Sequence, residues 1–199
     1  MREENRQLSL SLSIVIIFGF ALSLAFLLSV SASKDGGIYL EKEKLASAAN
    51  SSLPVRIKIP AINVDAPMEY VGLTLDGAMD VPKGPAEAAW YMLGPRPGEI
   101  GSAVLAGHSG WKNNVPAVFD DLHKLSKGDK IYIENEQGEI LTFVVRENRK
   151  YNPDADATDV FGSNDGGAHL NLVTCIGIWN ETEKSRSDRL VVFADKATE

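Results

Sequence analysis

The chain has 199 residues, of which 44% are hydrophobic and 24% charged, and its formal net charge is -7. Arg2 and Arg6 cancel Glu3 and Glu4, so all of this negative charge lies beyond an N-terminal apolar segment, and it argues against nucleic acid or anionic lipid as the main partner. The residues after that segment are enough for one domain with its own hydrophobic core.

The first predicted element is an apolar helix near the N-terminus. Residues 7–33 contain no charged side chain, and residues 14–30 are rich in Ile, Leu, Val and Phe. A helix of roughly 20 such residues crosses a hydrocarbon core of about 30 Å. We therefore predict a cytoplasmic tip over residues 1–7 and a transmembrane signal anchor over residues 8–30.

A cleaved secretory signal is the alternative for this segment, because Val30-Ser31-Ala32 offers small residues at a plausible cleavage site. The apolar stretch is longer than the usual signal core of roughly 7–15 residues, which favours an uncleaved anchor. In either case the rest of the chain is exported. No second apolar span follows, and residues 31–53 are mostly polar or small, so we predict a linker leading into one domain over residues 54–199.

Within this domain the hydrophobic period is mostly two, which is typical of strands. Ile131 and Ile133 flank Tyr132, for example. The pattern predicts a mainly β fold with eight strands, which suits a barrel filled by its own side chains. The expected strands are residues 55–60, 63–68, a short piece near Trp90, 102–107, 130–134, 139–145, 169–175 and 189–194.

Two segments between these strands are predicted to be something else. Residues 118–125 place Val118, Leu122 and Leu125 on one face of an amphipathic helix. Residues 146–168 are expected to form a long loop that leads into the strand ending at Cys175.

Three residues at predicted strand ends carry the chemistry. Cys175 is the only cysteine, which excludes an intramolecular disulfide and a cysteine-based metal cluster, and it closes an apolar strand. His108 closes an earlier strand after Gly107, and Arg189 opens the last strand. A thiol, an imidazole and a guanidinium together suit acyl transfer through a thioester, although each residue alone is more often structural or solvated.

The combination resembles the signature of the sortase family of membrane-anchored cysteine transpeptidases. Members carry a Gly-His pair, a Thr-Cys pair and an arginine near the start of the final strand, and here Gly107-His108, Thr174-Cys175 and Arg189 occur in that order. The resemblance covers roughly residues 54–196 and is nearest to the simpler classes E and F. It implies a sortase-like eight-stranded β-barrel with short helices, preceded by the transmembrane helix.

The resemblance also implies a function. The expected enzyme cleaves a C-terminal sorting signal of exported proteins and transfers them to a cell-wall precursor or another amine, with Cys175 as nucleophile, His108 as proton carrier and Arg189 as oxyanion stabiliser. No cofactor and no metal ligand are expected. The protein is expected in the cell membrane of a Gram-positive-type envelope, as a single-pass protein with an extracellular catalytic domain and no nucleic-acid partner.

Two other functions remain open from the sequence. One is another exported cysteine transpeptidase or hydrolase acting on peptidoglycan stem peptides, and the other is a non-catalytic, membrane-tethered binding barrel. Rival residues are less well placed. His123 is expected to be solvated, His169 lies about 20 Å from Cys175 along an extended strand, and Arg186 belongs to a polar run.

Overall fold

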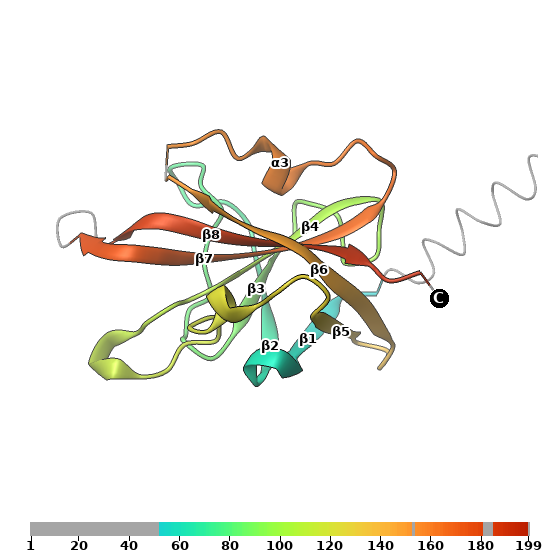
Figure 1. Ribbon diagram of the computed structural model, residues 1–199, viewed down its shortest axis with the longest axis horizontal. Coiled ribbons are helices and arrows are strands. Elements are labelled where there is room, and N and C mark those ends of the chain that lie inside the picture. The colour runs from blue at the N-terminus through green and yellow to red at the C-terminus, as the bar shows by residue number, and fades with distance from the viewer. Residues whose placement is uncertain (1–51, 153, 181–184, 199) are drawn as a thin grey trace, which may run out of the picture. The chain divides into compact units, whose positions relative to one another are not determined.

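The computed structural model describes residues 52–152, 154–180 and 185–198. In these residues eight strands form a closed barrel in the order β1-β2-β3-β4-β7-β8-β6-β5 (Figure 1). The strands are β1 (Pro54–Ile59), β2 (Val64–Val71), β3 (Ala88–Tyr91), β4 (Gly101–Gly107), β5 (Lys130–Asn135), β6 (Ile140–Tyr151), β7 (Ala168–Asn180) and β8 (Ser185–Lys196). The predicted mainly β, eight-stranded barrel is confirmed.

Most neighbouring strands are antiparallel, but β2 pairs with β3 in parallel and β4 pairs with β7 in parallel. Parallel neighbours need a crossover connection, and the one between β4 and β7 contains β5 and β6. The helices are short: 3-10 helices η1 (Pro60–Ile62), η2 (Lys112–Asn114) and η3 (Leu122–Lys124), and α3 (Thr158–Phe161).

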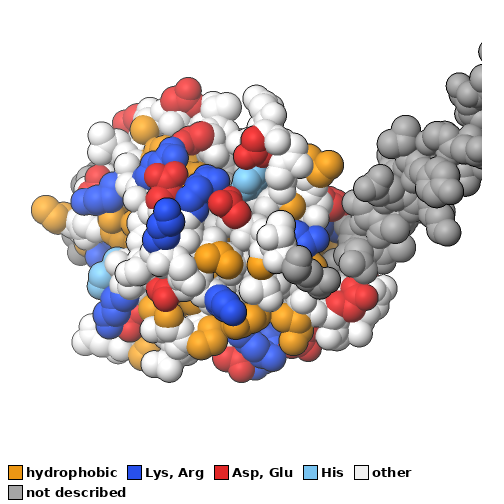
Figure 2. All heavy atoms as spheres, turned by 45° about the vertical axis from the view of Figure 1, so that its right-hand side comes forward, with side chains coloured by type: hydrophobic (Ala, Val, Ile, Leu, Met, Phe, Trp, Pro, Cys, Tyr) orange, Lys and Arg blue, Asp and Glu red, His pale blue; other side chains and the backbone are white. Residues whose placement is uncertain are grey.

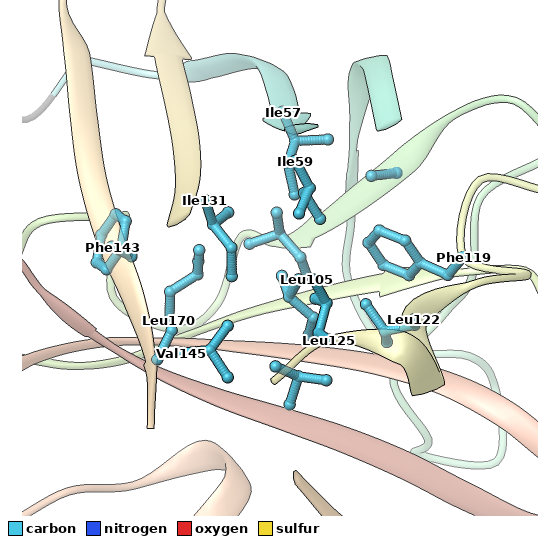
Figure 3. Close-up of a cluster of buried hydrophobic side chains, with 14 of the residues drawn as sticks. Ile57, Ile59, Leu105, Phe119, Leu122, Leu125, Ile131, Phe143, Val145 and Leu170 are labelled. Atoms are coloured by element: carbon cyan, nitrogen blue, oxygen red, sulfur yellow. The ribbon is translucent and has the colours of Figure 1, made fainter. Parts of the chain in front are cut away.

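The barrel is filled by the alternating apolar side chains that predicted its strands. Ile131 and Ile133 of β5 are fully buried, and so are Leu170 and Leu172 of β7. Figure 3 shows side chains from β1, β4, β5, β6 and β7 meeting inside the barrel. Burial of this apolar surface at about 25 cal/mol per Å² is the main stabilising contribution.

The helix predicted for residues 118–125 is wrong. The backbone there forms successive turns that end in η3, with hydrogen bonds from Leu122 N to Phe119 O and from Leu125 N to Leu122 O. The N–H of Phe119 instead donates to His108 O at 2.9 Å, which removes it from any helical ladder. The turns still bury Leu122 and Leu125, so the apolar spacing located core residues without defining their backbone.

Three predicted strand ends are also corrected. β6 runs to Tyr151 and takes up the first six residues of the expected loop, because its polar residues pair with β8. β7 continues past Cys175 to Asn180, and β8 begins at Ser185 rather than at Arg189. Gly177, with φ +87°, lies at the register shift that let the pair continue beyond the break in the apolar pattern.

The predicted transmembrane anchor over residues 8–30 and nearly all of the linker lie outside the described residues. Within the described part of the chain, no helix has the length and apolar character needed to cross a membrane.

Candidate active site

Cys175 and Arg189 lie directly opposite each other on the antiparallel strands β7 and β8. Residues paired in this way project from the same face of the sheet, with Cβ atoms about 5 Å apart. Cys175 is partly exposed, so the thiol is not locked in the core. The guanidinium of Arg189 is half-buried, and its Nη1 donates to the carbonyls of Arg186 and Asp188 at 2.9 and 3.2 Å.

The parallel pairing of β4 with β7 brings His108 to the same place. Ala106 is the register partner of Val173, so His108 and Cys175, each two residues further on, lie at the same end of the two strands. The buried hydroxyl of Thr174 donates to Gly107 O at 2.7 Å and ties the two strands together there. The strands therefore set the thiol and the imidazole side by side.

The sequence requires glycine before this histidine for a packing reason. A Cβ atom at Gly107 would lie 2.3 Å from the Phe119 ring, far inside van der Waals contact. Phe119 itself is fully buried, so it has little room to move.

His108, Cys175 and Arg189 line one groove of about 1450 Å³. Part of the groove wall is apolar and comes from α3 and from the β2–β3 loop (residues 72–87). It includes Val160, Phe161, Met79 and Val81. A groove of this kind accommodates an extended peptide with apolar side chains.

Sequence reasoning missed three groups in this groove. Arg186 is half-buried, donates to Gly177 O at 2.9 Å and lines the groove, contrary to the solvated position expected for it. Trp111 lies against the His108 ring with centroids 4.7 Å apart, and Pro82 O lies 2.8 Å from His108 Nε2. The only sequence signal for Trp111 is its position three residues after the histidine.

The other two histidines do not line the groove. The His123 side chain is exposed, and its Nδ1 lies 3.1 Å from Asp120 O. His169 bonds to Asp165 through Nε2 at 2.9 Å and to Asp195 through Nδ1 at 2.7 Å. Burial opposes the charge of His169, but these two carboxylates outweigh it and hold the pKa of His169 above its ordinary value.

Charged side chains elsewhere are mixed in sign. On the face drawn in Figure 2, Lys and Arg side chains lie beside Asp and Glu side chains. An example of such a network is Arg149, which pairs with Glu147 and Asp159 and packs 4.6 Å above the Phe193 ring. Among the described residues, no group of three or more His, Cys, Asp and Glu side chains is placed to hold a metal ion.

A barrel that gathers one thiol, one imidazole and one guanidinium in an apolar groove fits the class of cysteine acyl-transfer enzymes. The chain belongs to the sortase family: the family model described as Sortase domain matches residues 57–197. It is accordingly a cysteine transpeptidase, and this finding favours the sortase hypothesis over the two alternatives.

Named relatives agree with this assignment. Sortase A of Bacillus anthracis is 29% identical over 175 residues, covering 83% of this chain and 70% of the relative. The solved structure of sortase C-1 from Actinomyces oris has a TM-score of 0.57 at 26% identity, with 73% of this chain and 76% of that one covered. A lid mutant of sortase A from Corynebacterium diphtheriae has a TM-score of 0.57 at 25% identity, with coverages of 84% and 83%.

Proposed function

We propose that this sortase cleaves a sorting signal near the C-terminus of exported proteins with Cys175 as the nucleophile, His108 as the proton carrier and Arg189 as the oxyanion donor. The observation that supports these roles best is the cross-strand pairing of Cys175 with Arg189, on a face where His108 lines the same groove. The assignment to class E or F remains a prediction.

The proposed reaction proceeds in two acyl transfers. The Cys175 thiolate attacks the scissile carbonyl, the C–N bond breaks, and the departing amine takes a proton from the His108 imidazolium. A second amine then attacks the thioester and gives a proton to His108, and the C–S bond breaks to restore the thiolate. Arg189 donates hydrogen bonds to the oxyanion in both steps.

The catalytic roles are tested by mass spectrometry of the full chain mixed with candidate sorting peptides. We expect a peptide acyl adduct on Cys175 in the wild type and none in Cys175→Ala, whose circular dichroism spectrum stays that of the wild type. An adduct on another residue, or turnover by Cys175→Ala, contradicts the proposal.

We also propose that residues 8–30 anchor the enzyme as a single-pass protein in the cell membrane, with the linker over residues 31–53 holding the catalytic domain outside. The uncharged stretch of residues 7–33 supports this topology. The protein should fractionate with membranes, and protease added outside intact cells should cut beyond Ser33. Release of the domain by cleavage after Ala32 contradicts the anchor.

A tether raises the effective concentration of membrane-bound substrates. A secreted chain that begins near Ser52 should therefore cleave peptides at the wild-type rate and attach surface proteins poorly in cells. Equal surface display by both forms at equal export levels contradicts this role of the anchor.

A further inference from the structure

The imidazole of His108 is held by a backbone carbonyl that lies 26 residues away in the sequence. His108 Nε2 is 2.8 Å from the carbonyl oxygen of Pro82, in the β2–β3 loop. A carbonyl oxygen can only accept a hydrogen bond, so Nε2 is the donor and carries a hydrogen. This holds for the imidazolium and, where the contact is kept, for the neutral ring as well.

The β2–β3 loop holds this carbonyl in place from both sides. Asp80 N donates to Gly72 O at 3.0 Å, which closes the loop on itself before Pro82. Val118 N donates to Pro85 O at 2.7 Å, which fastens the loop after Pro82 to the turns that follow His108. The acceptor is therefore part of a fixed frame around the histidine.

Trp111 restricts the ring from another direction. Its ring centroid is 4.7 Å from that of His108, at an interplanar angle of 57°. The segment that carries Trp111 is fixed by Asp120, whose carboxylate accepts hydrogen bonds from Gly110 N at 2.5 Å and Ala117 N at 2.9 Å. A flip of the His108 ring, which would exchange its two nitrogens, requires Trp111 to move.

The second ring nitrogen is left for chemistry. None of the hydrogen bonds between described residues involves His108 Nδ1, and His108 lines the groove that contains Cys175. We infer that Nδ1 moves the catalytic proton, and that the Pro82 carbonyl and the Trp111 side chain are positioning groups that fix the Nε2–H tautomer. This inference rests on the proposed function.

The proton balance of the reaction then passes through one atom. The Cys175 thiol gives its proton to Nδ1, which leaves a thiolate and an imidazolium. When the C–N bond of the substrate breaks, the departing amine takes that proton from Nδ1. The incoming amine returns a proton to Nδ1 as it attacks the thioester. The Nε2 hydrogen stays on Pro82 O throughout.

The tautomer is tested first, without any substrate. Nitrogen-15 NMR of histidine-labelled full-length protein distinguishes a protonated ring nitrogen from an unprotonated one. We expect neutral His108 to carry its hydrogen on Nε2, and Trp111→Leu to give a mixture of both tautomers. Trp111→Phe should keep the single form, and so should Trp179→Leu, which alters the same groove elsewhere. A neutral ring protonated on Nδ1 overturns the inference.

The route of the proton is tested by replacing His108 with each of its two N-methyl analogues. Methylation of Nδ1 should lower peptide turnover about 100-fold or more, to the level of His108→Ala, because general acid–base catalysis contributes about that much. Methylation of Nε2 breaks the contact with Pro82 but leaves Nδ1 able to exchange a proton, so turnover should stay measurably higher. Full activity with methylated Nδ1 overturns the inference, whereas the absence of an acyl adduct on Cys175 is the separate failure of the proposed function.

Discussion

The contact between Gly107 and Phe119 offers a sharp test of how the histidine is positioned. A Cβ atom added at Gly107 would lie 2.3 Å from Phe119 Cδ2 and 2.7 Å from Cε2. Ordinary contact begins at 3.4 Å, so the ring must move by 1.1 Å (3.4 minus 2.3). Phe119 is fully buried, and its N–H donates to His108 O at 2.9 Å, so this movement also displaces the histidine.

We expect Gly107→Ala to lower both stability and turnover. Overpacking a core site typically costs about 1–3 kcal/mol. In a domain of this size about 2 kcal/mol corresponds to a fall in Tm of about 4–8 °C. Turnover should fall further than the small loss of folded protein explains, because the His108 backbone is pulled away from the end of β7.

The assay is thermal unfolding combined with peptide cleavage for a double-mutant cycle. Phe119→Leu shortens the ring that obstructs the new methyl group, so Gly107→Ala/Phe119→Leu should be more stable than the sum of the single effects by about 1 kcal/mol or more. Gly72→Ala is the matched control, since its added Cβ would meet only Met92 Cε at 4.0 Å. Additive effects in the cycle, or a neutral Gly107→Ala, refute the reasoning.

Three further predictions concern other parts of the site. Arg189→Lys keeps the charge but loses the planar donor fork, so turnover in a peptide assay should fall by about 100-fold, and an equal effect of Arg186→Lys contradicts the specific role of Arg189. The pKa of His169 is raised in the folded state, so its contribution to stability is complete below the unfolded value of about 6.5 and is lost as the pH rises through the folded value. Melting curves should accordingly show Tm falling with alkaline pH in the wild type, and a flat profile there with an unchanged slope in His169→Gln would contradict the ion pairing with Asp195. Asn171 donates from Nδ2 to Val160 O at 2.6 Å, so Asn171→Leu should cost about 1–3 kcal/mol of stability and raise KM more than it lowers kcat, because α3 forms part of the groove wall.

Much of the barrel could be predicted from the sequence because burial on one face leaves a period of two. Ile131 and Ile133 flank Tyr132, and their burial fixed both the strand and its inward face. The end of β6 could not be predicted in this way. Its last residues are charged or polar on both faces, and Arg149 pairs with acidic side chains and packs on Phe193, which local sequence does not reveal.

The predicted site residues were found from strand ends and from the family pattern, and the structure places all three in one groove. Pro82 and Trp111 were missed for a physical reason. Pro82 acts through a backbone carbonyl, which every residue type possesses, so its identity gives no signal. Trp111 contacts the histidine only because the following turns are not helical, and the helical interpretation of residues 118–125 concealed that geometry.

The parallel pairing of β4 with β7 also affects how the enzyme folds. His108 and Cys175 are 67 residues apart in the chain (175 minus 108), and β5 and β6 lie between the strands that carry them. Closing a loop of this length costs conformational entropy before any contact repays it, so pairs of this kind form slowly. During synthesis the thiol is therefore present well before its histidine is beside it. The chain gains acyl-transfer chemistry only when the barrel closes, which protects an immature molecule from reacting with its own surroundings.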